Sequence, residues 1–268
     1  MVFDICAQEK ENTLSDGLKV MSYNIRLGSA DDKTNSWALR YTATEEMLKD
    51  QAPDVFGVQE ALEYQVRYIK EMCGYECVGV GRENGKKAGE HMSIFWNKKT
   101  VSLLKWGTYW LSETPEVMSK DWDSACYRIC SYAILKDKAT EREFVVFNTH
   151  LDHISDTARI NGIQVVLDKI AEFGSLPAVL MGDLNAEEDS ETYRSATVNF
   201  LDAKYQTENT MTSCTYQNWG TELDSNCIDY VMISKTGLKV NSYKVITETY
   251  DGVYTSDHFP LSVSLSFE

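Results

Sequence analysis

The sequence predicts an α/β protein in which mixed β-sheets form layers and helices cover them from outside. Strand-like runs rich in β-branched and aromatic residues recur along the chain, and two intervals between them have the spacing of amphipathic helices. Hairpin-like runs between about residues 75 and 151 add antiparallel pairs to the strand-helix-strand intervals. This combination favours a layered sandwich over a purely parallel sheet.

Eight segments are predicted as strands because they concentrate Val, Ile, Tyr, Phe or Thr. In chain order they are 18–25, 55–60, 92–96, 128–135, 142–151, 178–185, 227–234 and 261–267. The stretch KWGTYWLS, residues 105–112, also has a strand-like composition. The chain is therefore predicted to contain at least eight strands.

Two segments are predicted as helices that cover a sheet. In 36–50 the apolar residues are spaced four apart, at Leu39, Ala43 and Met47. In 155–174 one apolar stripe contains Ile160, Ile163, Leu167 and Ile170. Gly174 follows this stripe and predicts the end of the helix.

The composition indicates one globular domain over residues 18–268. The chain has 43% hydrophobic residues and only 4 prolines, with no linker-like stretch and no internal repeat. No apolar run reaches the roughly 18 residues that a membrane span requires. The formal charge of −15 disfavours a broad grip on nucleic acid, and the seven cysteines have no zinc-like spacing.

The segment 1–17 is treated separately from this domain. Small residues near Cys6 and Ala7 resemble the end of a secretory signal, although its basic region and full apolar segment are missing. If 1–17 is the remnant of a signal, the protein is periplasmic or secreted. Otherwise it is cytoplasmic.

Polar residues occur where the apolar runs stop, and in α/β folds the strand ends present the chemistry. They are Asn24, Glu60, His150, Asp183, Asn185, Asp257 and His258. Each one alone could be a turn residue, a helix cap or a solvated histidine. Asp229 is harder to explain, because Ile228 and Tyr230 flank it and a buried carboxylate needs a partner. His258 is the candidate partner.

Together these residues predict a metal site with phosphoryl chemistry. Most of them are carboxylates and amides, which suit Mg²⁺, with Mn²⁺ or Ca²⁺ as alternatives, rather than zinc. Such a set leaves coordination positions open for phosphate oxygens and water.

The ordered series SYNIR, GVQE, NTHLD, GDLNA, IDYV and SDHFP resembles the endonuclease/exonuclease/phosphatase superfamily. This group includes pancreatic deoxyribonuclease, apurinic-site endonucleases, neutral sphingomyelinases and inositol-polyphosphate phosphatases. The resemblance extends from about residue 18 to 267. It implies a four-layer α-β-β-α sandwich of two mixed sheets, with helices outside and the site at one edge of the sheets.

The resemblance also implies roles around the metal and the attacking water. Glu60 would be the principal Mg²⁺ ligand, with Asn24 and Asp257 around the same ion. Asp183 would orient and deprotonate the water, and Asn185 would hold that water or a phosphate oxygen.

On the phosphate side, the resemblance implies that His258 donates to the phosphate and that Asp229 holds its tautomer. His150 would be the second histidine, oriented by Glu90 in the nuclease branch. Arg128 falls where relatives have a phosphate-facing arginine. For Glu90 and Arg128, a solvated surface position or a core ion pair is the alternative.

Trp122 lies among charged neighbours shortly before Arg128 and is predicted to stack on a sugar or base. The surrounding SETP, DWD and CYR fragments resemble a bacterial branch of the superfamily with poorly defined substrates, some of them sugar-phosphate phosphatases. His91 and His153 are assigned no role.

A small sugar-phosphate-type metabolite is therefore the expected substrate. Because a basic stripe with interleaved aromatics is missing, nuclease activity on nucleic acid is kept as the alternative. Lipid phosphodiesterase activity is a less favoured alternative, since no membrane-docking helix is evident. A non-catalytic binding module would be expected to lack at least one site residue, and no protein partner is predicted.

Overall fold

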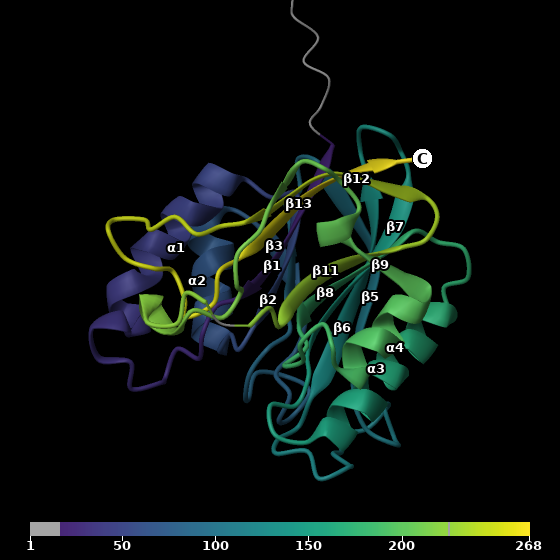
Figure 1. Cartoon of the computed structure of the whole chain (residues 1–268), viewed down its shortest axis with the longest axis horizontal. Coiled ribbons are helices and arrows are strands. Elements are labelled where there is room, and N and C mark those ends of the chain that lie inside the picture. The colour runs from purple at the N-terminus through teal and green to yellow at the C-terminus, as the bar shows by residue number, and fades with distance from the viewer. Residues whose placement is uncertain (1–16, 225) are drawn as a thin grey trace, which may run out of the picture.

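The computed structural model describes residues 17–224 and 226–268 (Figure 1). The predicted signal remnant at 1–17 therefore lies, except for Gly17, outside the described residues. Within those residues, every helix is too short or too polar to cross a bilayer.

Two mixed sheets form the centre of the fold. From edge to edge, the first sheet contains β10 (Thr210–Met211), β12 (Leu238–Val245), β13 (Leu261–Phe267), β1 (Leu18–Asn24), β2 (Val55–Gln59), β4 (Ile94–Trp96) and β3 (Glu76–Val78). The second contains β5 (Val101–Trp110), β6 (Ile129–Asp137), β7 (Glu143–His150), β8 (Ala178–Asp183), β11 (Asp229–Ser234) and β9 (Phe200–Asp202). Each sheet has a parallel pair near its middle, β1 with β2 and β7 with β8, among antiparallel neighbours.

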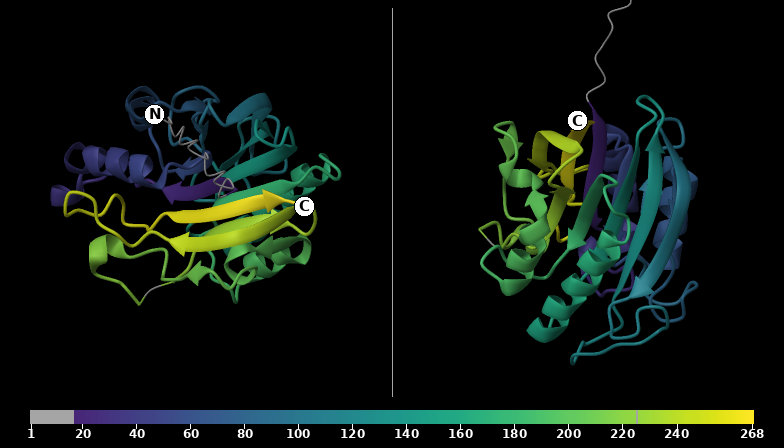
Figure 2. Two further views of the ribbon diagram at one scale, coloured as in Figure 1. Left: turned by 90° about the horizontal axis from the view of Figure 1, so that it is seen from above. Right: turned by 90° about the vertical axis from the view of Figure 1, so that its right-hand side faces the viewer.

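The sheets pack face to face, and helices cover their outer faces (Figures 1 and 2). The helices α1 (Trp37–Gln51) and α2 (Glu63–Cys73) lie on the first sheet, and α3 (Asp156–Ala171) and α4 (Glu191–Asn199) lie on the second. Short 3₁₀ turns are η1 (Lys33–Asn35), η2 (Ala203–Tyr205) and η3 (Asn218–Gly220). Three apolar clusters fill the spaces between successive layers. The predicted four-layer α-β-β-α sandwich is thus confirmed.

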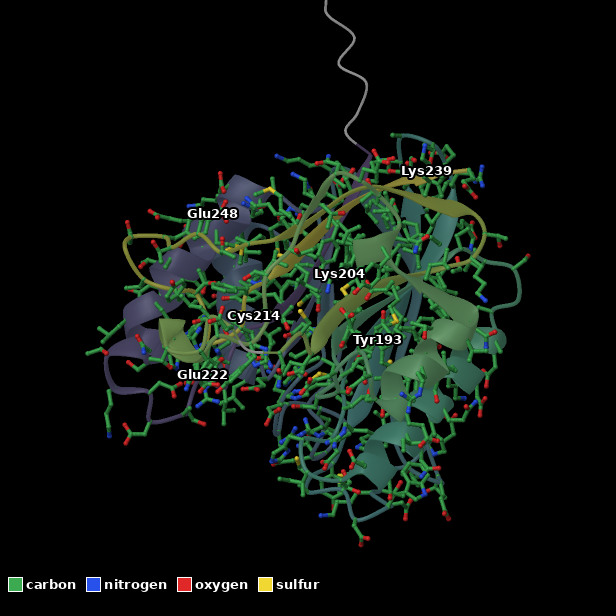
Figure 3. The ribbon with its side chains drawn as sticks, viewed as in Figure 1. Tyr193, Lys204, Cys214, Glu222, Lys239 and Glu248 are labelled. Atoms are coloured by element: carbon green, nitrogen blue, oxygen red, sulfur yellow. The ribbon has the colours of Figure 1, made fainter. Side chains whose placement is uncertain are left out.

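Local sequence determines where several helices begin and end. Ser155 caps α3 by accepting a hydrogen bond from the Ala158 N–H, and Ser190 caps α4 in the same way through Tyr193. Tyr193 also ties α4 to the sheet, because its ring packs on Tyr230 and its hydroxyl donates to Asp202 at 3.0 Å (Figure 3).

The eight predicted strands correspond to β1, β2, β4, β6, β7, β8, β11 and β13, and KWGTYWLS overlaps β5. The helices α2 and α4 and the strand β12 were not predicted. The placement of Leu39 on the buried face of α1 was wrong, since 61% of its surface is exposed. Trp37 and Arg40 turn inward instead, so the buried stripe of α1 is rotated from the one that Leu39 would indicate.

A buried asparagine links the two sheets close to their polar edge. Asn148 of β7 donates to the carbonyl oxygens of Val58 and Ser93, at 2.9 and 3.0 Å, and accepts from Gln59 at 2.6 Å. Gly57 makes room for it, because a Cβ at that position would lie 2.5 Å from the Asn148 Cγ. A polar side chain therefore satisfies backbone groups of the opposite sheet.

We expect Asn148→Leu to lower the free energy of unfolding by about 2 to 4 kcal/mol, because the Val58 and Ser93 carbonyls each lose a buried donor and Gln59 loses its acceptor. Urea denaturation measures this change. The control Asn199→Leu, at the exposed end of α4, should change it by less than about 0.5 kcal/mol. Equal stabilities for the two variants would contradict the role of Asn148.

Candidate active site

The strand registers bring three predicted residues together at one edge of the second sheet. His150, the last residue of β7, is paired in register with Asp183, the last residue of β8. Asp183 is in turn paired with Asp229, the first residue of β11. Residues in register project from the same face of a sheet, so the three side chains form a row. The His150 Nε2 lies 3.5 Å from the Asp183 Oδ2.

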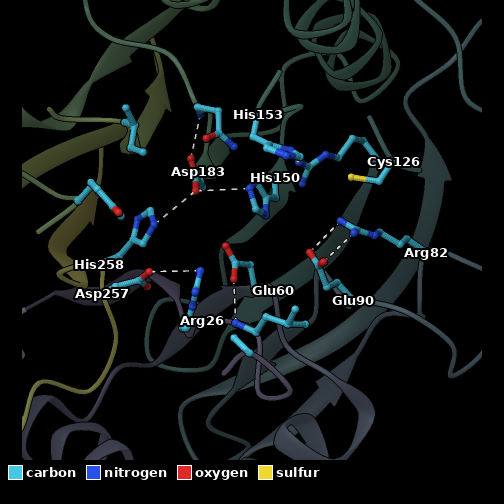
Figure 4. Close-up of a pocket in the computed structure, with 16 residues that line it drawn as sticks. Arg26, Glu60, Arg82, Glu90, Cys126, His150, His153, Asp183, Asp257 and His258 are labelled. Atoms are coloured by element: carbon cyan, nitrogen blue, oxygen red, sulfur yellow. Dashed lines mark hydrogen bonds and ion pairs between the residues drawn. The ribbon is translucent and has the colours of Figure 1, made fainter. Parts of the chain in front are cut away.

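His258 completes this row from the loop before β13. Its Nδ1 is 2.8 Å from the Asp229 Oδ2. Its Nε2 is 4.0 Å from the Asp183 Oδ2, a contact that Figure 4 shows. Burial opposes the charged imidazolium, but the Asp229 carboxylate outweighs it and raises the pKa of His258 to about 10. The predicted contact between Asp229 and His258 is therefore present, and the buried carboxylate has its cationic partner.

The pKa values of Asp183 and His150, in the same row, are shifted in opposite directions. Burial and the neighbouring Asp229 raise the pKa of Asp183 to about 7. Burial and the Arg128 and Arg82 charges lower the pKa of His150 well below its usual value. At neutral pH, His150 is thus a neutral imidazole, and the raised pKa makes Asp183 a stronger base than an ordinary carboxylate.

The first sheet contributes Asn24 and Glu60 from the adjacent ends of β1 and β2. The Asn24 Nδ2 donates to the Glu60 Oε1 at 3.1 Å and to the Asp183 Oδ2 at 3.0 Å. The Asn24 Oδ1 accepts from the Arg26 N–H. Asn24 thus faces the carboxylates with its nitrogen, while its oxygen accepts from the backbone. In this structure it holds the two carboxylates at a fixed separation.

Asp257 and Arg26 form the remaining side of the cluster. The Arg26 Nη1 lies 3.4 Å from the Asp257 Oδ2, while its Nε and Nη2 hold Asp32 at 3.0 and 2.9 Å. Burial raises the pKa of Asp257, and the Glu60 charge raises it further. The sequence analysis missed Arg26, although it follows Asn24 at the same strand end.

The donor set fits a hard divalent cation. Glu60, His150 and Asp183 each offer a ligand atom, and these atoms lie within 4.8 Å of one another. The buried Asp257 adds a further carboxylate to the same cavity. The cations of the cavity are already paired, Arg26 with Asp32 and Asp257, His258 with Asp229, and Arg82 and Arg128 with Glu90 and Asp152, so negative charge remains in excess. Oxygen-rich clusters of this kind suit Mg²⁺ or Mn²⁺.

The backbone is left-handed at three residues of the site. Arg26, Glu60 and Asn185 have φ values of 63°, 63° and 47°. Non-glycine residues adopt such values at an energetic cost, and they concentrate at functional sites. Asn185 is held by two contacts, its N–H to the Asp183 Oδ1 and its Nδ2 to the Leu151 carbonyl.

Except for Asn24 and Asp229, these groups line one cavity of about 440 Å³, together with a second polar wall. On that wall Arg82 and Glu90 form a two-pronged ion pair, with N···O distances of 2.6 and 2.8 Å (Figure 4). Glu90 was expected to orient His150, but the structure pairs it with Arg82. The His150 Nδ1 has no hydrogen-bond partner among the described residues. The guanidinium offers two parallel charge-assisted bonds and is the stronger partner.

Arg128 also lies on this wall, buried as a paired residue rather than exposed. Its Nε is 3.4 Å from the Asp152 Oδ2, and its Nη2 is 2.8 Å from the His153 Nδ1. Asp152, His153 and Cys126 offer metal-ligand atoms within 4.8 Å of one another. Asp152, however, already accepts from backbone and hydroxyl groups of its loop and from Arg128. Its carboxylate is therefore occupied in holding the loop.

The structure does not place Trp122 in this cavity. Trp122 lines a separate hollow with its neighbours 120–124, and its carbonyl accepts a hydrogen bond from Ser155. Left-handed backbone at Trp122 and Asp123 turns the chain there. The ring predicted to stack on substrate is thus outside the site, and Tyr216, whose ring centroid is 5.1 Å from that of His258, is the aromatic residue inside it.

A buried arginine that sequence reasoning missed supports two loops of the site. Arg40 of α1 donates to the carbonyls of Asn35, Thr255 and Arg26 at 3.0, 2.7 and 3.2 Å. Its guanidinium also lies over the rings of Trp37 and Trp219. Thr255 is two residues before Asp257, so Arg40 ties the loops that present Arg26 and Asp257.

The fold and the site together define a class of proteins. These are four-layer α/β sandwiches in which carboxylates and histidines form a site at the shared edge of the two sheets. Residues 21–258 match the Endonuclease/Exonuclease/phosphatase family, and the chain belongs to that family. Its members are hydrolases that act on phosphate esters.

Solved structures of related proteins agree with this assignment. A family member from Bacteroides thetaiotaomicron is 35% identical with a TM-score of 0.90, over 94% of this chain and 98% of that one. A mannosyl-6-phosphatase from the same species is also 35% identical, with a TM-score of 0.89 over 94% and 100%. Human nocturnin is 28% identical over 153 residues, and this chain spans only 36% of its length.

We expect Arg40→Met to lower the free energy of unfolding by about 2 to 4 kcal/mol, because buried carbonyls in two loops lose a charged donor. Urea denaturation tests this expectation. Arg67→Met, on the exposed face of α2, is the matched control. If Arg40→Met were no less stable than that control, Arg40 would not support these loops.

Proposed function

We propose that the protein is a divalent-cation-dependent phosphoesterase that hydrolyses the phosphate ester of a small sugar-phosphate-type metabolite. The observation that carries the proposal is the row His150, Asp183, Asp229 and His258, which combines a base near neutral pKa with a buried imidazolium. Residues 18–268 are its catalytic domain in this proposal. Mg²⁺ is the expected ion, with Mn²⁺ or Ca²⁺ as alternatives.

Asp183 is the general base in this proposal. A catalytic base is most effective when its pKa lies near the working pH, and the pKa of about 7 meets that condition. Asp183 takes a proton from the attacking water as the water oxygen bonds to phosphorus. The P–O bond to the sugar breaks, and the sugar oxygen leaves as a hydroxyl after it takes a proton from solvent. Asn185, fixed by its backbone contact to Asp183, orients that water or a phosphate oxygen.

His258 stabilises the charge that develops on the phosphoryl oxygens. Because Asp229 occupies its Nδ1, the Nε2–H is the donor that remains for the substrate. A charged, buried donor of this kind acts in a low-dielectric site and is already oriented before the reaction. Neutral His150 is the second donor on the phosphate side.

Glu60 and Asp257 would hold the divalent cation, and Asn24 would keep Glu60 and Asp183 in place. When bound, the cation polarises the phosphate and neutralises charge that develops during hydrolysis. Arg26 limits the repulsion among the carboxylates through its contact with Asp257.

The size of the cavity and the net charge support a small substrate. About 440 Å³ accommodates a phosphorylated sugar, and the formal charge of −15 disfavours long polyanions. The 35% identity to a mannosyl-6-phosphatase points to the same class of substrate.

Hydrolysis can be tested with a panel of hexose phosphates and glycerol phosphates, beside nicking of supercoiled plasmid. We expect phosphate release in Mg²⁺, its loss in EDTA, and intact plasmid throughout. Nicking without phosphate release would instead establish the nuclease alternative.

His258→Ala should lower turnover by about 100-fold or more, since one charged donor to the phosphate is lost. Steady-state kinetics with saturating Mg²⁺ measures this effect. The metal requirement should remain close to that of the native protein, and circular dichroism checks that Asp229, left without its partner, has not changed the fold. Unchanged turnover would remove His258 from the mechanism.

Glu60→Gln should raise the Mg²⁺ concentration needed for half-maximal activity at least about tenfold, because a ligand charge is lost. Glu63→Gln, three residues further on and paired with Lys87 at the surface, is the matched control and should keep the native requirement. Identical metal titrations for the two variants would show that Glu60 is not a ligand.

A further inference from the structure

The Arg82–Glu90 pair occupies a position in the cavity that the proposed hydrolysis does not use. Both side chains line the cavity on the wall opposite Asp183 and His258, and both are nearly buried (Figure 4). The two terminal nitrogens of Arg82 bind Glu90 with one N–H each, and the second N–H of each nitrogen has no acceptor among the described residues. These N–H groups and the remaining lone pairs of Glu90 are the hydrogen-bonding capacity that the pair keeps for a ligand in the cavity.

The loop 79–91 holds this pair rigidly. The Arg82 N–H donates to the Glu90 carbonyl at 3.0 Å, and the Trp110 Nε1 donates to the Arg82 carbonyl at 2.9 Å. Gly81 permits a close chain crossing, because a Cβ there would lie 2.2 Å from the Ala88 oxygen. The pair is therefore pre-organised, which lowers the entropic cost of binding a ligand.

A stabilising role alone does not explain the pair. Removing two charges from water costs free energy that their attraction often only balances, so buried ion pairs are weak stabilisers. Apolar side chains of similar volume would close this wall at least as well. The retained donors and acceptors suggest recognition of a polar ligand.

The charges on this wall indicate what kind of ligand fits. Arg82 is balanced by Glu90, and Arg128 is balanced by Asp152. Partial burial and the Arg128 charge lower the pKa of His153, which is neutral at physiological pH. The wall thus offers hydrogen bonds without net positive charge, which suits neutral hydroxyl groups better than a second phosphate.

We propose that Arg82 and Glu90 form a hydroxyl-binding subsite for the sugar of a singly phosphorylated substrate. A free terminal N–H of Arg82 donates to one sugar oxygen, and the Glu90 carboxylate accepts from a neighbouring hydroxyl with the lone pairs that Arg82 leaves open. This inference rests on the proposed function for the position of the phosphate. In this proposal, the wall opposite the reacting groups selects the substrate.

The subsite can be tested by binding without turnover. Calorimetric titration in Mg²⁺ would compare a hexose 6-phosphonate, which cannot be hydrolysed, with methylphosphonate, which has no hydroxyls. For the native protein we expect the hexose phosphonate to bind at least about tenfold more tightly, as one or two charge-assisted hydrogen bonds would give. Arg82→Met should abolish most of that ratio.

Glu90→Gln keeps the volume of the side chain and is the second variant, in case Arg82→Met does not fold. It leaves the Arg82 charge unbalanced, so the hexose ratio should fall while binding of a hexose bisphosphonate improves relative to the monophosphonate. General damage to the loop would not produce that improvement. Glu116→Gln, at the exposed surface pair with Lys169, should behave like the native protein.

Two results would overturn the subsite: a native protein without preference for the hexose compound, or a preference that both variants retain. The test separates the subsite from the proposed function. If the preference depends on Arg82 but the native protein releases no phosphate from hexose 6-phosphates in Mg²⁺, the subsite stands and the proposed activity fails.

Discussion

The burial of several carboxylates at one edge of two packed sheets is the constraint on which the site depends. Glu60, Asp183, Asp229 and Asp257 approach one another there, and three of them are almost fully removed from solvent. Such a group is stable only if cations or hydrogen-bond donors compensate it. His258 compensates Asp229, Arg26 compensates Asp257, and Asn24 bridges Asp183 and Glu60. The excess negative charge that remains is the physical reason to expect a divalent cation.

Much of the site could be predicted because it lies at strand ends. Parallel strands place their ends at one sheet edge, so a polar residue after each apolar run already indicated a common site. The contact between Asp229 and His258 followed from a different argument, since a carboxylate inside an apolar strand needs a partner. Both inferences depend on local sequence and on one rule of sheet geometry.

The other wall could not be predicted in the same way. Arg82 lies in a glycine-containing loop, and nothing in its local sequence indicates that Glu90 will take it as a partner in place of His150. Arg40 has the pattern of an ordinary helix residue, and only the tertiary fold brings the carbonyls of two loops to it. Trp122 was misplaced because composition cannot predict the left-handed turn that directs the chain away from the cavity.

The position of a bound cation tests the central claim most directly. Crystals grown with Mn²⁺ and measured at its absorption edge would locate the ion by anomalous scattering. We expect a peak in contact with Glu60, inside the carboxylate cluster between the two sheets. A peak confined to the Cys126, Asp152 and His153 group, or a cluster that stays empty at millimolar Mn²⁺, would contradict it.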